Sequence, residues 1–408
     1  INTCDSTLIS TNTITNGSYC WSNISSINWE MVGNNNFSCM DNHYSDLAIA
    51  PDGTPYTVVM GGACGGSYST GYDVEVFKFI NSQWTSIGLL TSKANGYTAP
   101  VIKFNHNVLP IVDYTDFGNG EVTTNTYDGN NLYNSSTTFS LGNVGSSDID
   151  MVMDQNGLPY IAMDIGGNIR LARMTDDTPN SEVWEWVDFW GYSNDGIIGQ
   201  GNIYSESNPS IYFDTSSYYL YIAYDDGPSY NACHLKKWDP STHFLIDYGS
   251  CSGSQPVISV SDNNTVFMAV DSLWTSYYDG GVRLYEIVDT LWNDLGSWTN
   301  IPTKFKSLNL INNTPYISYI ENSNGFNSFS TVSANVGLVK FDGSPIHLSH
   351  TNPITGINAA GNAIGINTYF GYDWNKNVDL DIYNNEIYLS YSDDLNNNQL
   401  TVKKIGVG

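Results

Sequence analysis

SDIDMVMDQNGLPYIAMDIGGNIRLARM, residues 147–174, is the stretch that decides the fold of this chain. Apolar residues alternate in 149–153 and in 159–163, and the turn sequence Asp-Gln-Asn-Gly separates the two segments, which predicts a pair of antiparallel strands. A Gly-Gly-Asn turn leads into a third segment, 169–174, and a fourth follows around Trp184. Four short strands in a meander predict one blade of a β-propeller.

The same pattern recurs along the chain and is clearest in its second strand. That strand has seven copies, at residues 56–59, 111–114, 160–163, 221–224, 267–270, 316–319 and 388–391. A first strand such as 46–50, 209–213 or 378–382 precedes each copy. Third strands are expected at 74–79, 122–127, 169–174, 233–238, 282–287, 336–341 and 400–405, and fourth strands at 84–87, weakly near 138–141, 184–187, 244–248, 292–295 and 346–348. We therefore expect an all-β, seven-bladed propeller of four-stranded antiparallel blades.

The third position of the second strand is small in most units. Its residues are Ala162, Ala223, Ala269, Ser318 and Ser390, with Val58 and Asp113 as the two departures. Twisted sheets that pack face to face around an axis alternate small and large residues, so this stripe is expected to belong to the core.

The seventh unit stops at Gly408 after only three strands. Residues 28–33, NWEMVG, match the outer strand QWTSIG at 83–88, yet no inner strands precede them. We expect Trp29, Met31 and Val32 to complete the last blade, so that the two ends of the chain pair and no sheet edge stays open. The alternative is that Trp29 is a stray aromatic residue in a loop.

Two regions follow from this closure. Residues 27–408 form the propeller, and residues 1–26, rich in Ser, Thr and Asn, form an extension pinned by a disulfide. The chain begins at Ile1 with neither a methionine nor a signal segment, which fits a mature, processed form.

Charge and hydropathy exclude several classes of partner. The net charge is -27 with only 14 Lys and Arg, so the surface repels nucleic acid and anionic lipid. No window approaches the roughly 18 to 20 apolar residues that span a bilayer, and membrane insertion is not expected.

Cysteines and glycosylation sequons favour an extracellular location, secreted or at the cell surface. No C-x-x-C motif and no histidine at zinc spacing accompany the cysteines, so disulfides are expected. Neighbours in sequence give the pairs Cys4–Cys20, Cys39–Cys64 and Cys233–Cys251, one of 15 possible pairings. The sequons are at Asn16, Asn23, Asn36, Asn134, Asn263 and Asn312, some of which arise by chance in so Asn-rich a chain.

The units resemble the repeats of secreted bacterial and environmental propeller proteins, with the pattern D-x-x-G-x-P-Y-v-A-Y-x-D, then V-x-K-f-d-G, then W-x-x-v-G. The matching pieces are DGTPY at 52–56, YIAYDD at 221–226, KFDG at 340–343 and WTSIG at 84–88. The resemblance covers about residues 28–408, although no unit carries every element. It implies a propeller in an extracellular setting, and it implies no reaction.

Recognised catalytic motifs are scarce. A sialidase-like site needs three arginines from different blades, but two of the three arginines, Arg170 and Arg173, share one strand. Carboxylates recur at or just after the second strand, which favours a structural role in holding turn amides over a glycosidase pair; they are Asp113, Asp164, Asp225 and Asp271. No catalytic residue is therefore assigned.

No cofactor is expected, and calcium is the one candidate ligand for the loops. Asp113, Asp116, Asn119 and Glu121 place oxygen donors close together, as a hard cation prefers. The order differs from an EF-hand, and Asp/Asn loops also close on their own backbone.

Two long insertions, 188–207 and 349–376, are the candidate contact surface. Their aromatic residues are Trp190, Tyr192, Tyr204, Tyr369, Phe370, Tyr372 and Trp374. The main hypothesis is a non-enzymatic structural protein, a subunit of a cell-surface coat or extracellular filament that binds copies of itself or other surface proteins, with the N-terminal extension contacting a neighbour. The alternatives are a propeller lectin that binds glycans and a hydrolase that acts on polysaccharide.

Overall fold

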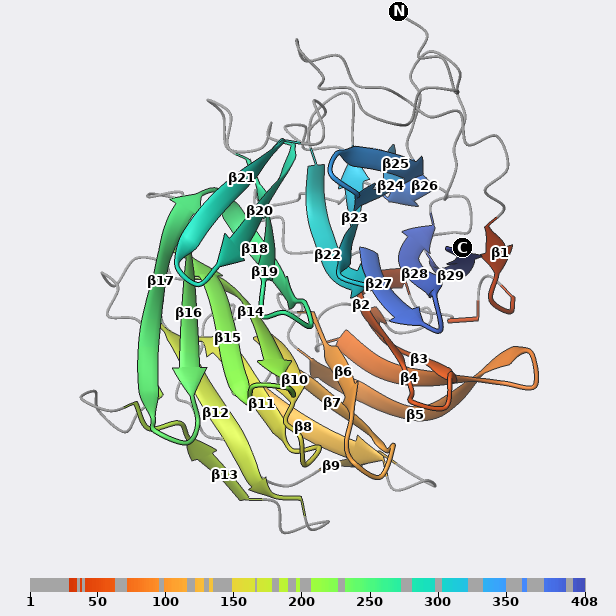
Figure 1. The fold of residues 1–408 in the computed structure, drawn as a ribbon. Helices are drawn as coiled ribbons and strands as arrows, with labels where there is room; N and C mark the ends of the chain where they lie inside the picture. The colour runs from red at the N-terminus through yellow and green to blue at the C-terminus, as the bar shows by residue number, and fades with distance from the viewer. Residues whose placement is uncertain are drawn as a thin grey trace, which may run out of the picture.

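The computed structural model confirms the all-β, seven-bladed propeller (Figure 1). It describes residues 29–34, 37–38, 41–62, 72–94, 99–115, 122–127, 132–134, 149–165, 167–177, 183–189, 196–198, 207–226, 232–272, 281–297, 303–321, 333–349, 362–364, 378–393 and 399–407. No helix long and apolar enough to cross a membrane occurs in these ranges.

Each blade is an antiparallel meander whose first strand lies at the axis of the ring. Blade 1 comprises β2 (Asp41–Ile49), β3 (Pro55–Gly62), β4 (Tyr72–Ile80) and β5 (Gln83–Ala94). Blade 2 comprises β6 (Val101–Phe104), β7 (Pro110–Thr115), β8 (Val122–Tyr127) and β9 (Leu132–Asn134). Blade 3 comprises β10 (Ile149–Met153), β11 (Pro159–Asp164), β12 (Ile169–Asp176) and β13 (Val183–Trp186). Blades 4 and 5 comprise β14 (Ser207–Asp214), β15 (Tyr219–Asp225), β16 (Ala232–Asp239) and β17 (Phe244–Ser252); and β18 (Ser254–Val260), β19 (Val266–Asp271), β20 (Val282–Val288) and β21 (Leu291–Ser297).

The last two blades form one continuous sheet. Blade 6 comprises β22 (Thr303–Ile311), β23 (Thr314–Glu321), β24 (Ser333–Phe341) and β25 (Pro345–Ser349), and blade 7 comprises β27 (Val378–Tyr383), β28 (Glu386–Asp393), β29 (Gln399–Gly406) and β1 (Glu30–Met31). The short strand β26 (Asn362–Ile364) pairs with both β24 and β28 and so connects the two blades.

The predicted closure of the ring is confirmed. Strand β1 pairs antiparallel with β29, with Glu30 opposite Lys404 and Met31 opposite Lys403. The N–H of Val32 continues the ladder by donating to the carbonyl of Val402 at 3.0 Å. The edge of β29 is therefore covered by the first strand of the chain rather than left open.

Trp84 of blade 1 also binds the closure segment, residues 29–33, through its indole N–H. Trp84 donates from Nε1 to the carbonyl oxygen of Val32 at 2.7 Å, and the ring of Phe37 stacks on Trp84 at 4.7 Å. The same contact recurs between blades 4 and 5, where Trp292 donates to the carbonyl of Tyr248 at 2.6 Å. These tryptophans explain why the outer-strand motif begins with Trp.

The hydrophobic core lies between the blades. Neighbouring residues of β3 face opposite blades, since Val58 packs with Val112 of blade 2 whereas Val59 packs with Val402 of blade 7. Adjacent pairs of Asn in the hairpin turns, such as Asn312 and Asn313 with φ of 49° and 64°, adopt the left-handed conformation that two-residue hairpin turns require. The high Asn content therefore has a local structural reason.

One strand differs from the prediction, and part of one predicted insertion is described. The fourth strand of blade 2 is Leu132–Asn134, which pairs with β8 through Asn134 opposite Asn125, and not the segment near 138–141, which lies outside the described residues. Within the insertion 188–207, Phe189 and Ile198 are buried in the core between blades 3 and 4, so these two residues contribute to packing.

Candidate functional site

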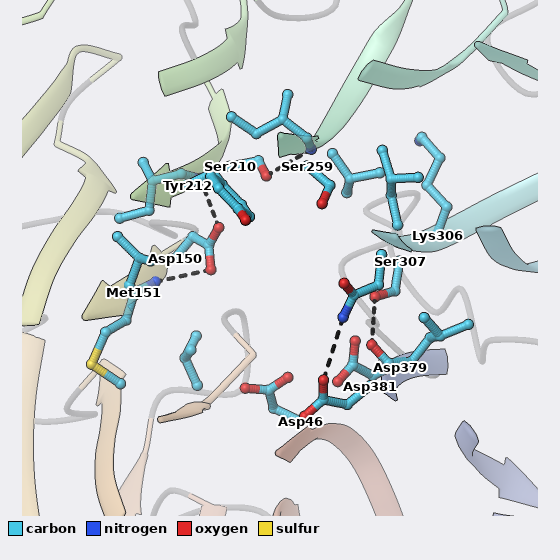
Figure 2. Close-up of a pocket in the computed structure, with 18 of the residues that line it drawn as sticks. Asp46, Asp150, Met151, Ser210, Tyr212, Ser259, Lys306, Ser307, Asp379 and Asp381 are labelled. Atoms are coloured by element: carbon cyan, nitrogen blue, oxygen red, sulfur yellow. Dashed lines mark hydrogen bonds between the residues drawn. The ribbon is translucent and has the colours of Figure 1, made fainter. Parts of the chain in front are cut away.

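A cavity of about 310 Å³ lies on the axis of the ring (Figure 2). The first strands of all seven blades contribute to its lining. Because side chains alternate along a strand, every second residue of these strands faces the next blade and the axis.

One position of the first strand, here called the axial position, repeats around the cavity. In every blade it pairs directly with the third residue of the second strand, which is Ala or Ser in five blades, for example Ala162 opposite Asp150 and Ser390 opposite Asp379. The seven axial residues are Asp46, Val101, Asp150, Ser210, Val257, Ser307 and Asp379. The cavity is therefore lined by residues opposite the small stripe that the sequence reveals.

Polar axial residues join each blade to the next. Asp46 accepts the N–H of Ile102 at 2.7 Å, and Asp379 accepts the N–H of Leu47 at 3.0 Å. Equivalent bonds run from Ile211 N–H to Asp150 at 2.9 Å, from Ile258 N–H to Ser210 at 3.2 Å and from Ser307 Oγ to the Leu380 carbonyl at 3.4 Å. Buried backbone groups need such partners, so these side chains stabilise the ring.

Asp46 and Asp379 form a carboxyl pair beside the cavity. Burial raises the pKa of Asp46 well above its usual range; Lys103 opposes the rise, whereas the charge of Asp379 and the hydrogen bond between the two side chains increase it. A second carboxyl group close by favours the protonated form, so Asp46 keeps its proton to a higher pH than an ordinary aspartate does.

A second charged layer lies two residues further along the strands. Burial raises the pKa of Asp381 to about 6, against the opposing effects of Lys103 and of the N–H groups of Ile49 and Ile382. For Lys103, burial acts to lower the pKa, but the attraction of Asp46 and three further aspartates outweighs it and raises the pKa. Lys103 is thus held as an ammonium ion among carboxyl groups.

The opposite wall of the cavity is polar but uncharged. Figure 2 shows Ser210, Tyr212 and Ser259 there, with Asp150 across the opening from Asp379 and Asp381. These groups supply hydroxyl donors and acceptors together with one aromatic face, a combination typical of sugar-binding sites.

Two residues that line the cavity, Asn208 and Gln255, have an uncommon backbone conformation. Asn208 and Gln255 occupy bulges in β14 and β18, each with φ of 50°, which is uncommon for residues other than glycine. Asp225 holds both, because its Oδ2 accepts from Asn208 Nδ2 at 3.0 Å and from the Gln255 N–H at 2.8 Å. Such strain is concentrated at functional sites.

Lys306, the second basic residue of the lining, is held by a carboxylate of the neighbouring blade. Its Nζ lies 2.9 Å from Asp271 Oδ1, and its side chain is 1% exposed. Asp225 and Asp271, two of the recurring carboxylates, therefore each bind a residue of the next blade. Asp164 does hold a turn amide, because it accepts the N–H of Gly167 at 2.9 Å.

Asp113 does not belong to the cavity. It is fully buried in β7, opposite Val101 and Thr124, and burial raises its pKa to about 7 despite the hydrogen bond from Thr124. Asp164 is also absent from the lining of the cavity, so neither of these two carboxylates belongs to the candidate site. A buried carboxyl that favours its neutral form is also a poor calcium ligand.

The other predicted sites are described only in part. Asp116, Asn119, Glu121, the cysteines Cys4, Cys20, Cys39 and Cys64, the sequons Asn16, Asn23 and Asn36, the extension 1–26 and all seven aromatic residues proposed for the contact surface lie outside the described residues. Within the ranges that are described, no group of three His, Cys, Asp or Glu side chains is arranged for a metal ion. Cys233 and Cys251 face each other in register across β16 and β17, and Asn263 and Asn312 are exposed in turns.

Sequence reasoning missed the charged residues of the cavity. A signal was present, because Asp379 and Asp381 alternate with apolar residues in a strand expected to be buried on both faces. The register between first and second strands was needed to place them at the axis.

No protein-family model and no curated protein matches the chain. Among solved structures, it is similar to a polysaccharide lyase, described as an ulvan lyase of family PL25 bound to -[GlcA(1-4)Rha3S]-, with a TM-score of 0.54 and 8% identity over 93% of this chain and 96% of that one. It is also similar to a putative 6-phosphogluconolactonase from Bacteroides fragilis, with a TM-score of 0.50 and 9% identity over 74% of this chain and 82% of that one. At such identities these matches establish the propeller fold and assign no reaction.

The comparisons contradict the prediction of a non-enzymatic coat or filament subunit. The two solved structures named above are described as a polysaccharide lyase and a putative lactonase, so a lack of familiar catalytic motifs in the sequence was not evidence against catalysis. Motif searches detect residues close together in sequence, whereas a propeller assembles its axial site from one or two residues of each blade.

Proposed function

We propose that this protein is a hydrolase that acts on polysaccharide in the axial cavity. The observation that carries the proposal is the hydrogen-bonded carboxyl pair Asp46–Asp379 at one side of the cavity, with Asp150 on the other (Figure 2). Hydrolysis of a glycosidic bond uses two carboxyl groups, one protonated and one ionised.

In the proposed reaction, the pair donates its proton to the glycosidic oxygen while the bond from that oxygen to the anomeric carbon breaks. Asp150 accepts a proton from water, whose oxygen bonds to the anomeric carbon. One water is consumed, each product gains a hydroxyl group, and proton exchange with solvent restores both carboxyl sites. Asp150 is fixed for this role by the N–H groups of Met151 and Ile211, both at 2.9 Å.

The charge of the cavity favours hydrolysis over the elimination that a lyase performs on a uronate. Four aspartates line the cavity, and Lys103 is the one lining lysine whose charge is not already balanced by Asp271. This excess of negative charge repels a substrate carboxylate. The substrate of the similar ulvan lyase is therefore not the one expected here. An extracellular location, which the cysteines and sequons favour, is part of the proposal.

The test is the release of reducing ends from a panel of neutral, amino and uronic polysaccharides. Asp46→Asn keeps an acceptor for the Ile102 N–H but removes the carboxyl proton, so we expect at least a 100-fold loss of activity. Asp52→Asn is the matched control, since Asp52 lies in the same blade in an exposed turn. Equal activity of Asp46→Asn and the control, or no release from any polysaccharide, contradicts the proposal; binding without release identifies a lectin instead.

A further inference from the structure

We infer that the sugar held in the axial cavity carries a protonated amino group, as in an unacetylated hexosamine. This inference rests on the proposed function and adds the chemical class of the substrate. Its basis is the mismatch of charge and of hydrogen-bonding groups among the residues that line the cavity.

The charges of the cavity do not balance. Four aspartates line the cavity, Asp46, Asp150, Asp379 and Asp381, against two lysines. Lys103 supplies a single positive charge, because Lys306 is already paired with Asp271 at 2.9 Å. A bound cation removes this excess, and in a site partly shielded from water its attraction is stronger than at the surface.

One hydroxyl group of the lining also lacks a hydrogen-bond partner among the described residues. Ser45 lines the cavity and is 2% exposed, and its Oγ has no hydrogen-bond partner among the described residues. Figure 2 shows the hydroxyl of Ser259 directed into the opening. An ammonium group donates three hydrogen bonds and accepts none, so it suits a cavity in which oxygen acceptors exceed donors.

The carboxylates favour an ammonium ion over a bare metal ion. Asp381 accepts on both oxygens, from Ile49 N–H at 2.7 Å and from Ile382 N–H at 2.7 Å, and the two oxygens of Asp150 are used in the same way. Asp381 Oδ1 also accepts a hydrogen bond from Asn309 Nδ2 at 3.3 Å. One lone pair therefore remains on Asp381 Oδ2 and on each oxygen of Asp150, which is enough for a hydrogen bond from an ammonium group but leaves too few free lone pairs to coordinate a bare metal ion.

A sugar ring provides the remaining contacts. Tyr212, Asn208 and Gln255 are among the lining residues, and Figure 2 shows Tyr212 at the edge of the opening, where an aromatic ring can contact the C–H groups of a pyranose. The cavity volume of about 310 Å³ accommodates one or two sugar units.

The test is calorimetric titration of the whole protein at low ionic strength with glucosamine, N-acetylglucosamine, glucose and glucuronate. We expect glucosamine to bind at least about 10-fold more tightly than N-acetylglucosamine, and glucuronate not to bind. Asp150→Asn should abolish the preference and Ser45→Ala should weaken it, whereas Asp52→Asn should preserve it. Thermal unfolding of each variant confirms that it folds.

Two results overturn the inference. Equal affinity for glucosamine and N-acetylglucosamine refutes the amino-group assignment but leaves the hydrolase proposal standing. Failure of every monosaccharide to bind also refutes it, and release of reducing ends from polysaccharide then decides the proposed function independently. Preferential release from chitosan over chitin oligosaccharides is the corresponding result expected in that assay.

Discussion

Asp379 accepts the backbone N–H of Leu47 at 3.0 Å, although 332 positions separate the two residues in the sequence. The same carboxyl group is hydrogen bonded to Asp46. One side chain therefore joins the last blade to the first at the axis and forms half of the proposed proton donor. Closure of the ring and chemistry in the cavity depend on the same residue.

Substitutions of Asp379 should separate these two roles. Asp379→Asn keeps an oxygen acceptor for Leu47, so the free energy of unfolding should change little, while hydrolysis is lost. Asp379→Ala leaves the Leu47 N–H buried without a partner and should lower the free energy of unfolding by about 1–3 kcal/mol. Urea denaturation of both variants measures this difference; equal stability of the two contradicts the structural role.

Stability should fall as pH rises from 5 to 8. Burial raises the pKa of Asp113 to about 7 and of Asp381 to about 6, and raises that of Asp46 further above its usual range. A carboxyl group with a raised pKa binds its proton more tightly in the folded state, so its contribution is complete at pH values below about 4 and is lost as pH rises through the folded-state pKa. Thermal unfolding across this pH range provides the measurement.

Asp113→Asn should flatten this pH dependence, because asparagine is neutral at every pH. Each pKa unit corresponds to about 1.4 kcal/mol, so at pH 8 the variant should be more stable than the original protein by on the order of 2 kcal/mol or more. A variant whose melting temperature declines with pH as steeply as that of the original protein would show that Asp113 does not titrate in this range.

The closure segment can be tested at Gly33. Its φ is +75°, and a Cβ there would lie 2.7 Å from the ring of Phe79 and 3.0 Å from Trp84. Gly343 has a similar φ of +71° with no atom within 4 Å of a Cβ, so Gly343→Ala is the matched control for backbone strain alone. We expect about 1 kcal/mol of destabilisation for Gly343→Ala and about 2–4 kcal/mol for Gly33→Ala. Equal losses would mean that the packing of Gly33 against Trp84 does not stabilise the seam.

The Cys233–Cys251 disulfide remains a prediction, and the register now gives it a structural basis. The two residues are directly opposite each other in the β16–β17 ladder, within reach of a cross-strand disulfide. Protein made in an oxidising compartment and denatured without reductant should leave both cysteines unalkylated, as peptide mass spectrometry would show. Reduction of the bond should lower the free energy of unfolding by about 3 kcal/mol for a loop of this size. Alkylation of both thiols before reduction contradicts the bond.

Period-two alternation and recurring turns were sufficient to predict the fold, since each unit repeats the same local pattern. The closure was predictable because residues 28–33, NWEMVG, match the sequence of an outer strand but are not preceded by inner strands of a blade. The candidate site was not predictable from the sequence. The axial position carries Asp in only three blades and Val or Ser in the other four, so it forms no recognisable sequence motif. Asp113 was misleading for a related reason: it occupies the small-residue stripe, where only the structure reveals that its carboxyl is sealed between two blades.

The measurement that tests the central claim most directly is a crystal structure of Asp46→Asn soaked with an oligosaccharide that the original protein cleaves. If the protein is a hydrolase of the kind proposed, electron density for a sugar should lie in the axial cavity. A glycosidic oxygen should lie beside residue 46 and Asp379, and Asp150 should lie on the opposite side of the sugar ring. Sugar density confined to the outer faces of the blades, with the cavity occupied only by solvent, would contradict it.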